Sequence, residues 1–242
     1  MKTLKTLFLG LGAFIATLSF NSCLDDDGNP YYDSEWGIAT VKPLSNESYY
    51  LQWDDTTTFL PVNSRVPYFG LEKERRARIF FTLVNDSTPK DYDYAVVINR
   101  IDSILTKSIV PSLEDKNDEV YGTDPIDLTS IWIEDGYINF QFSAYFGGNE
   151  KHFINLVQMD ETAPYELEFR HNAYHDPWTS TGWGLAAFRL NTLPDTNGET
   201  VKLKIKFKSY NGDKTYEIDY NSTRATSGKA PRIDSKDYQT LN

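Results

Sequence analysis

The strictest pattern in the sequence, and the strongest constraint on its fold, is an alternation across residues 201–208. Every second position is apolar and each is followed by lysine; the apolar residues are Val201, Leu203, Ile205 and Phe207. Successive side chains of a β-strand point to opposite faces of the sheet. The pattern therefore predicts a strand with one face buried and the other in water.

Comparable segments recur along most of the chain, so the sequence predicts an all-β protein. Strands are expected at 36–42, 49–53, 78–84, 92–99, 103–107, 137–144, 151–157, 166–170, 183–190, 201–208 and 214–220. Helical spacing is weak, and only residues 71–78 have a pattern suited to a turn or two of helix. Many short strands separated by turn residues are typical of barrels and sandwiches.

The turn between the last two expected strands contains Asn211-Gly212, the preferred dipeptide of a two-residue type I′ hairpin. A turn centred on this pair places Lys206 opposite Glu217 and Lys204 opposite Asp219 on the outer face. On the inner face it places Phe207 opposite Tyr216, Ile205 opposite Ile218 and Leu203 opposite Tyr220. Charge matching and apolar matching agree on this register.

The first 23 residues have the order of a lipoprotein export signal. Lys2 and Lys5 precede an uncharged run from Leu7 to Phe20, and the small residue Ser22 stands directly before Cys23. The run is too short to span a bilayer, which takes roughly 20 apolar residues. We expect cleavage after residue 22 and a lipid on Cys23, which anchors the protein to the outer membrane with surface exposure as an open alternative.

Charge and cysteine content exclude several classes of protein. Removal of residues 1–22 leaves 22 basic and 35 acidic residues, a net charge of −13 in place of −11. Such a surface repels phosphate backbones, so no nucleic-acid partner is expected. Cys23 is the single cysteine of the sequence, so the fold has no internal disulfide and depends on burial of apolar side chains.

Composition divides the chain into five segments. Residues 1–22 form the signal peptide and residues 23–35 a lipidated tether rich in aspartate. Residues 108–125 carry few apolar side chains and predict a domain boundary, so we expect one domain at 36–110 and another at 120–221. The polar segment 222–242 is expected to be a disordered tail.

Short motifs throughout the mature chain resemble those of the NigD-like lipoproteins of Bacteroidetes-type bacteria. They are Trp36-Gly37, Ala39-Thr40-Val41, Ile104–Lys107, Asp124-Pro125-Ile126, Ile131-Trp132-Ile133, Tyr137–Phe140, His152, Ile154–Val157, Phe169–Asn172, Tyr174 and Asp176. The resemblance implies an N-terminal OB-like barrel followed by a C-terminal antiparallel β-sandwich. It also implies a role in bacteriocin immunity, without assigning catalytic residues.

A loop at residues 171–183 is the candidate contact site for a ligand or partner. It carries Tyr174, His175, Trp178 and Trp183 among polar turn residues. Aromatic side chains in this setting suit a protein partner or a sugar. The alternative is that Trp178 and Trp183 fold inward and close the end of the sandwich.

No residue pattern predicts catalysis or a cofactor. His171, His175 and Asp176 have ligand chemistry, but their spacing suits a metal mainly on a helix, and this segment is expected to be a strand and loop. The cysteine is assigned to lipid, and no nucleophile motif is present in the sequence. We therefore expect a non-enzymatic envelope lipoprotein without metal that binds a protein or peptide such as a bacteriocin. A glycan-binding or glycan-processing lipoprotein is the alternative.

Overall fold

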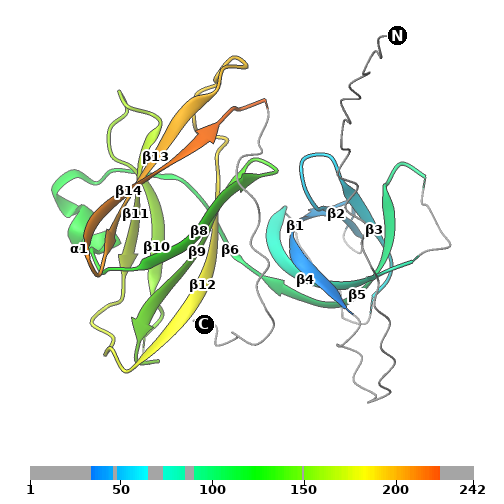
Figure 1. Cartoon of the computed structure of the whole chain (residues 1–242), viewed down its shortest axis with the longest axis horizontal. Coiled ribbons are helices and arrows are strands. Elements are labelled where there is room, and N and C mark those ends of the chain that lie inside the picture. The colour runs from blue at the N-terminus through cyan, green and yellow to red at the C-terminus, as the bar shows by residue number, and fades with distance from the viewer. Residues whose placement is uncertain (1–33, 46–47, 65–72, 85–89, 149, 224–242) are drawn as a thin grey trace, which may run out of the picture.

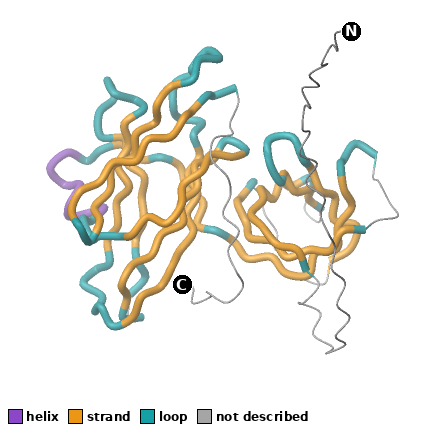
Figure 2. Tube along the Cα trace, viewed as in Figure 1, coloured by secondary structure: helices purple, strands orange, loops and turns teal. Residues whose placement is uncertain are grey.

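The computed structural model describes residues 34–45, 48–64, 73–84, 90–148 and 150–223, and nearly all the regular secondary structure in this part of the chain is β-strand (Figures 1 and 2). It forms a small barrel beside a larger sandwich. Across these ranges, no helix is both long and apolar enough to cross a membrane. The segments predicted as signal peptide and as lipidated tether up to residue 33, with Cys23, lie outside the described residues, as does the predicted tail from residue 224.

Five strands close the N-terminal barrel in the order β1-β2-β3-β5-β4. They are β1 (Glu35–Pro43), β2 (Tyr49–Gln52), β3 (Thr58–Ser64), β4 (Arg75–Leu83) and β5 (Tyr94–Ser103). β3 pairs with β5 in parallel, and the other pairs are antiparallel. Closure leaves the barrel without a free sheet edge.

The prediction of helix at residues 71–78 is wrong for the described part of that segment. Residues 75–78 begin β4, which pairs with both β1 and β5. Ala77, Ile79 and Phe81 alternate into the barrel core and are buried. The two-residue period of these buried positions extends across the strand and outweighs the helical spacing of a few residues.

The C-terminal domain is a sandwich of two sheets. One has the order β14-β13-β11-β10-β7, formed by β7 (Val110–Pro111), β10 (Phe153–Gln158), β11 (Glu166–Asn172), β13 (Val201–Ser209) and β14 (Gly212–Tyr220). The other has the order β6-β12-β9-β8, formed by β6 (Leu105–Ser108), β8 (Asp127–Glu134), β9 (Tyr137–Phe146) and β12 (Ser180–Arg189). Three neighbour pairs, β6–β12, β7–β10 and β11–β13, are parallel, so the sandwich is mixed rather than purely antiparallel.

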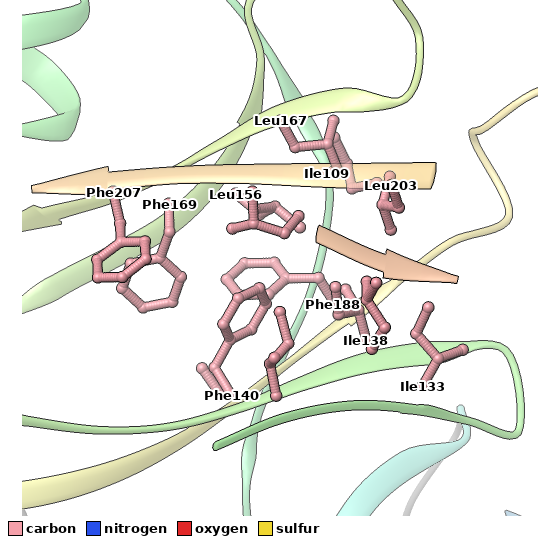
Figure 3. Close-up of a cluster of buried hydrophobic side chains, with 14 of the residues drawn as sticks. Ile109, Ile133, Ile138, Phe140, Leu156, Leu167, Phe169, Phe188, Leu203 and Phe207 are labelled. Carbon is pink, nitrogen blue, oxygen red and sulfur yellow. The ribbon is translucent and has the colours of Figure 1, made fainter. Parts of the chain in front are cut away.

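The sandwich core lies between the two sheets (Figure 3). Phe140 from one sheet packs against Phe169 from the other, with ring centroids 4.8 Å apart. A bulge between Leu128 and Ser130 shifts the register of β8 by one residue. Because of this shift, Leu128 and Ile131 both face the core although they are three positions apart.

The domain boundary falls earlier than the sequence predicts. Residues 105–108 pair with β12 and residues 110–111 with β10, so both segments belong to the sandwich and not to a first domain ending at 110. The following segment is also packed and does not form a loose linker. It contains a 3₁₀ turn (Glu114–Lys116) and α1 (Asn117–Tyr121), and the buried Tyr121 donates its hydroxyl hydrogen to the Pro111 carbonyl at 3.1 Å.

The β13–β14 hairpin has the predicted faces in a different register. Ser209 pairs with Gly212, so Tyr210 and Asn211 form the turn, and every partner is displaced by two residues. Gly212 has a φ of 97° whereas Asn211 has negative φ, which excludes the predicted type I′ turn at Asn211-Gly212 and matches a turn closed by a glycine bulge. The predicted pairs Lys206–Glu217 and Lys204–Asp219 are wrong; the structure pairs Lys204 with Glu217 and Lys202 with Asp219.

The barrel and the sandwich share a buried interface. Ile38 of the barrel packs with Trp132, Tyr137 and Ala187 on the outer face of the four-stranded sheet. Arg76 crosses this interface with its side chain fully buried. Its guanidinium donates to Glu134 at 2.5 Å, to Asn139 at 3.2 Å and to Thr40 at 3.1 Å.

Candidate functional site

Three aromatic side chains from separate segments meet at one end of the sandwich. Tyr145 comes from the end of β9, Trp178 from the β11–β12 loop and Tyr210 from the β13–β14 turn. The rings of Tyr145 and Trp178 stack with 5.2 Å between centroids and 10° between planes. Tyr210 stands edge-on to both, at 5.2 and 5.4 Å. We call these three residues the aromatic cluster.

The aromatic cluster is exposed but held in place by its surroundings. Trp178 is 59% exposed and Tyr145 38%. The Tyr210 hydroxyl accepts a hydrogen bond from the Tyr145 backbone N–H at 2.9 Å. The hydroxyl of Thr179, next to Trp178, donates to the Phe146 carbonyl at 3.0 Å. The rings are therefore ordered before a ligand arrives, which lowers the entropy cost of binding.

The loop that carries Trp178 contains a tight turn at its start. The backbone N–H of Asp176 donates to the Ala173 carbonyl at 2.9 Å, and the two residues between them, Tyr174 and His175, have φ of 50° and 63°. Left-handed backbone at two consecutive non-glycine residues is uncommon. Both side chains project into solvent at the tip of the turn.

A chain of buried polar groups supports this loop from below. His171 Nε2 lies 2.8 Å from His152 Nδ1, and His152 Nε2 lies 3.3 Å from Asp176 Oδ2. The same Asp176 oxygen accepts the backbone N–H groups of Gly147 at 2.5 Å and Gly148 at 3.1 Å. These hydrogen-bonded polar groups thus connect the Trp178 loop to the β9–β10 loop.

Burial, and secondly a charge on His152, lower the pKa of His171 to about 4. Its Nδ1 faces the Pro125 carbonyl at 3.4 Å. Neutral His171 has one ring N–H for its contacts with Pro125 and His152, so it acts as a structural hydrogen-bonding group. Among the described residues no three His, Cys, Asp or Glu side chains form a group that could hold a metal.

The structure separates the four residues that the sequence grouped as a candidate loop. Trp178 belongs to the aromatic cluster, and Tyr174 and His175 are exposed on the neighbouring turn. Trp183 lies within β12 and faces the barrel, where its ring is 6.0 Å from the guanidinium carbon of Arg78. The loop neither plugs the sandwich nor presents all four aromatic residues together, because β12 begins at residue 180.

Sequence reasoning missed Tyr145 and Tyr210. Tyr145 follows the alternating segment 137–144 at an outward position, and Tyr210 immediately precedes the Asn211-Gly212 turn signal. Aromatic residues at two strand ends were a usable signal, but only the fold brings these ends together. Burial raises the pKa of Tyr210, and the nearby Asp127 and Asp124 carboxylates raise it further. The cluster therefore borders negative charge.

Comparisons with known proteins agree with this architecture. The NigD-like N-terminal OB domain matches residues 38–104 and the NigD-like C-terminal β-sandwich domain matches residues 108–220. None of the curated proteins matches the chain.

Solved structures from Parabacteroides and Bacteroides species match over most of the chain. A candidate toxin-related protein from Parabacteroides distasonis has 42% identity and a TM-score of 0.74, covering 79% of this chain and 96% of its own. A NigD-like immunity protein from Bacteroides caccae has 19% identity and a TM-score of 0.61, covering 84% of this chain and 100% of its own. A candidate lipoprotein from Bacteroides fragilis has 13% identity and a TM-score of 0.55, covering 78% of this chain and 99% of its own. By its two domains and their order, the chain belongs to the NigD-like family.

Proposed function

We propose that this protein is a non-enzymatic cell-envelope lipoprotein, anchored to the outer membrane through a lipid on Cys23, that binds a protein or peptide at the aromatic cluster. The observation that carries the proposal is the ordered exposure of Trp178 against Tyr145 and Tyr210. Tryptophan and tyrosine dominate binding hot spots because they offer large, rigid contact areas. Because Trp178 is exposed and its ring is held by neighbouring rings, it is better placed to contact a partner than to stabilise the fold.

Charge supports a cationic partner, and a bacteriocin fits that description. The net charge of −13 expected for the mature chain, with 22 basic and 35 acidic residues, attracts basic peptides and proteins at a rate that falls as salt increases. The names of two structural neighbours, an immunity protein and a candidate toxin-related protein, agree with a role in protection against a toxic peptide. The name of a third agrees with lipid anchoring.

The central experiment measures binding of cationic bacteriocins from related strains to the mature protein and to Trp178→Ala. We expect the substitution to weaken binding at least tenfold, which corresponds to about 1.4 kcal/mol. Tyr94→Ala is the matched control, because Tyr94 is also exposed but lies on the barrel. Equal loss in both variants would contradict the assignment of the site.

The cellular test is deletion of the gene followed by challenge with the same bacteriocins. We expect greater sensitivity, restored by the wild-type gene and not by Cys23→Ala, because the unlipidated protein is not held at the envelope. Mass analysis of membrane-extracted protein should show acyl chains on Cys23. An unmodified mature N-terminus elsewhere would refute the anchor.

Glycan binding is the second candidate, favoured by the flat stack of Tyr145 and Trp178. Sugar rings bind to such aromatic faces largely through contacts that salt does not screen. Binding of a soluble glycan that persists in high salt and disappears in Trp178→Ala would support this candidate. A growth defect of the deletion strain on one glycan, with bacteriocin sensitivity unchanged, would replace the favoured proposal.

A further inference from the structure

The two long free edges of the sandwich lie on the same side. β14 has nine residues and β8 has eight, and within the described part of the chain each is the last strand of its sheet. The strands at the opposite side, β7 and β6, have two and four residues. Short edge strands are a common protection against unwanted pairing, whereas a long free edge offers a row of unpaired backbone groups.

Side chains on the core face of β14 are exposed at this side. The register places Tyr216 opposite Ile205 and Lys214 opposite Phe207, so both point towards the space between the sheets. Tyr216 is nevertheless 44% exposed, while Ile205 is fully buried. The sandwich is therefore open where β14 faces β8.

A cavity of about 240 Å³ occupies this opening. Its apolar lining comes from Leu128 and Ile131 of β8 on one side and from Phe207 and Tyr216 on the other. The lining is completed by polar side chains, among them Thr129, Ser130 and Lys214. Pockets for small molecules commonly have 300–1,000 Å³. The smaller volume and the strand edge beside it suit a single apolar side chain of an extended peptide.

One residue of the cavity lining is a direct sequence neighbour of the aromatic cluster. Ser209 lines the cavity and directly precedes Tyr210, and its hydroxyl donates to Asp127 at 3.4 Å. Asp127 also lines the cavity, and its charge acts on the Tyr210 hydroxyl. Asp127 is exposed and can pair with a basic residue of a bound segment, and Lys214 also lines the cavity, so the favourable charge is local to Asp127.

We propose that an extended segment of the protein partner adds to the edge of β14, with an apolar side chain in the cavity and a basic residue near Asp127. The inference rests on the proposed function and specifies how the partner is recognised. Backbone pairing supplies affinity in this mode, and alternate side chains supply specificity. Residues two apart on such a segment face the same side, which lets one apolar residue enter the cavity and another reach the aromatic cluster.

The test uses a synthetic nine-residue peptide of alternating lysine and apolar residues, labelled for fluorescence anisotropy. A scrambled peptide of the same composition controls for charge alone. We expect the alternating peptide to bind at least tenfold tighter and to slow amide hydrogen exchange in residues 212–220. Equal binding of the two peptides, or unchanged exchange in β14, would overturn the proposal.

Substitutions in β14 test whether peptide binding depends on the cavity or on the outer face of the strand. Tyr216→Ala should weaken binding of the alternating peptide about tenfold, whereas Tyr216→Phe and Thr215→Ala should leave it close to wild type. Thr215 is adjacent but lies on the outer face of the strand. Equal effects of Tyr216→Ala and Thr215→Ala would contradict a role for the cavity, and thermal melts of each variant check that it is folded.

The proposed pairing at the edge of β14 and the proposed binding at the aromatic cluster can be refuted independently. Bacteriocin binding that depends on Trp178 while β14 exchange is unchanged would refute the pairing and retain the proposed function. Protection of β14 without dependence on Trp178 would retain the pairing and refute the cluster. Protection of β14 that rises with protein concentration in the absence of peptide would identify a second copy of the chain as the occupant and overturn the proposal.

Discussion

The domain interface and the aromatic cluster use similar side chains for different purposes. At the interface Arg76 is fully buried and Trp132 is 1% exposed, and the guanidinium donates to three side chains. At the cluster Trp178 is 59% exposed, and its described ring contacts are with Tyr145 and Tyr210. Burial makes the interface a source of stability, while exposure leaves the cluster available for contact.

The largest effect is expected from Arg76→Ala. This change leaves Glu134 without its cation in a largely buried site, where desolvation already raises the pKa of the carboxyl. Loss of one partner of a buried ion pair costs about 3–5 kcal/mol. Urea denaturation measures the change, and Arg75→Ala is the control because Arg75 is exposed. A loss below about 1 kcal/mol would show that the interface is not a stabilising unit.

A pH effect of intermediate size is expected from His171. Its pKa is about 4 in the folded protein and about 6.5 when unfolded, so between these values the unfolded chain binds a proton that the folded chain does not. The free energy of unfolding should therefore fall as the pH drops from 6.5 to 4, by on the order of 3 kcal/mol.

Replacement of the histidine isolates this effect from the titration of carboxylates. Denaturation of His171→Phe should show a flatter dependence on pH between 4 and 6.5 than the wild type. His175→Ala should retain the wild-type dependence, because His175 is exposed at the tip of the turn. Parallel curves for all three proteins would contradict the buried neutral state of His171.

Trp178→Ala should have a smaller effect on stability than on binding. Loss of its two ring contacts should cost about 1 kcal/mol in total, because an exposed ring gains about the lower end of the 0.5–1.5 kcal/mol range for each aromatic pair. Thermal melting measures this cost beside the tenfold or greater loss of bacteriocin affinity. A loss of stability as large as that of Arg76→Ala would show that Trp178 is a structural residue and would remove the contrast between the two regions.

The smallest effect is expected at the rim of the interface, where Lys42 contacts Asp135 at 2.9 Å. Both side chains are partly exposed, and such pairs contribute about 0–1 kcal/mol. A double-mutant cycle of Lys42→Ala and Asp135→Ala should give a coupling energy in that range, declining as salt increases. Coupling above about 2 kcal/mol would extend the behaviour of the buried interface to its rim.

In β13, local periodicity was enough to predict which residues face the core. Leu203 and Ile205 are buried and Lys202 and Lys206 are exposed, as the alternation indicates. The hairpin register was not predicted, because a displacement of two residues preserves every face and charge pairing barely distinguishes the alternatives. The turn geometry decides between the two registers.

The candidate site was also predicted only in part, because local patterns do not show which segments meet in the fold. Trp178 sits among polar turn residues, which indicated a surface loop, but Trp183 lies only five positions later and is directed towards the barrel by β12. Tyr145 and Tyr210 are 65 residues apart in sequence, and the Tyr145 backbone N–H donates a hydrogen bond to the Tyr210 hydroxyl. No local pattern encodes such a contact.

By itself, the sequence determined most of the strands, the order of the two domains and the family resemblance, since these follow from residues along one segment at a time. It did not predict β3 or β8, where apolar and polar residues do not alternate regularly. The tertiary structure decided the features that need two or more segments at once. These are the burial of Arg76 between the domains, the aromatic cluster at the sandwich end and the open side between β14 and β8. Each depends on which side chains meet across the fold, and that is set by strand pairing and packing rather than by local preference.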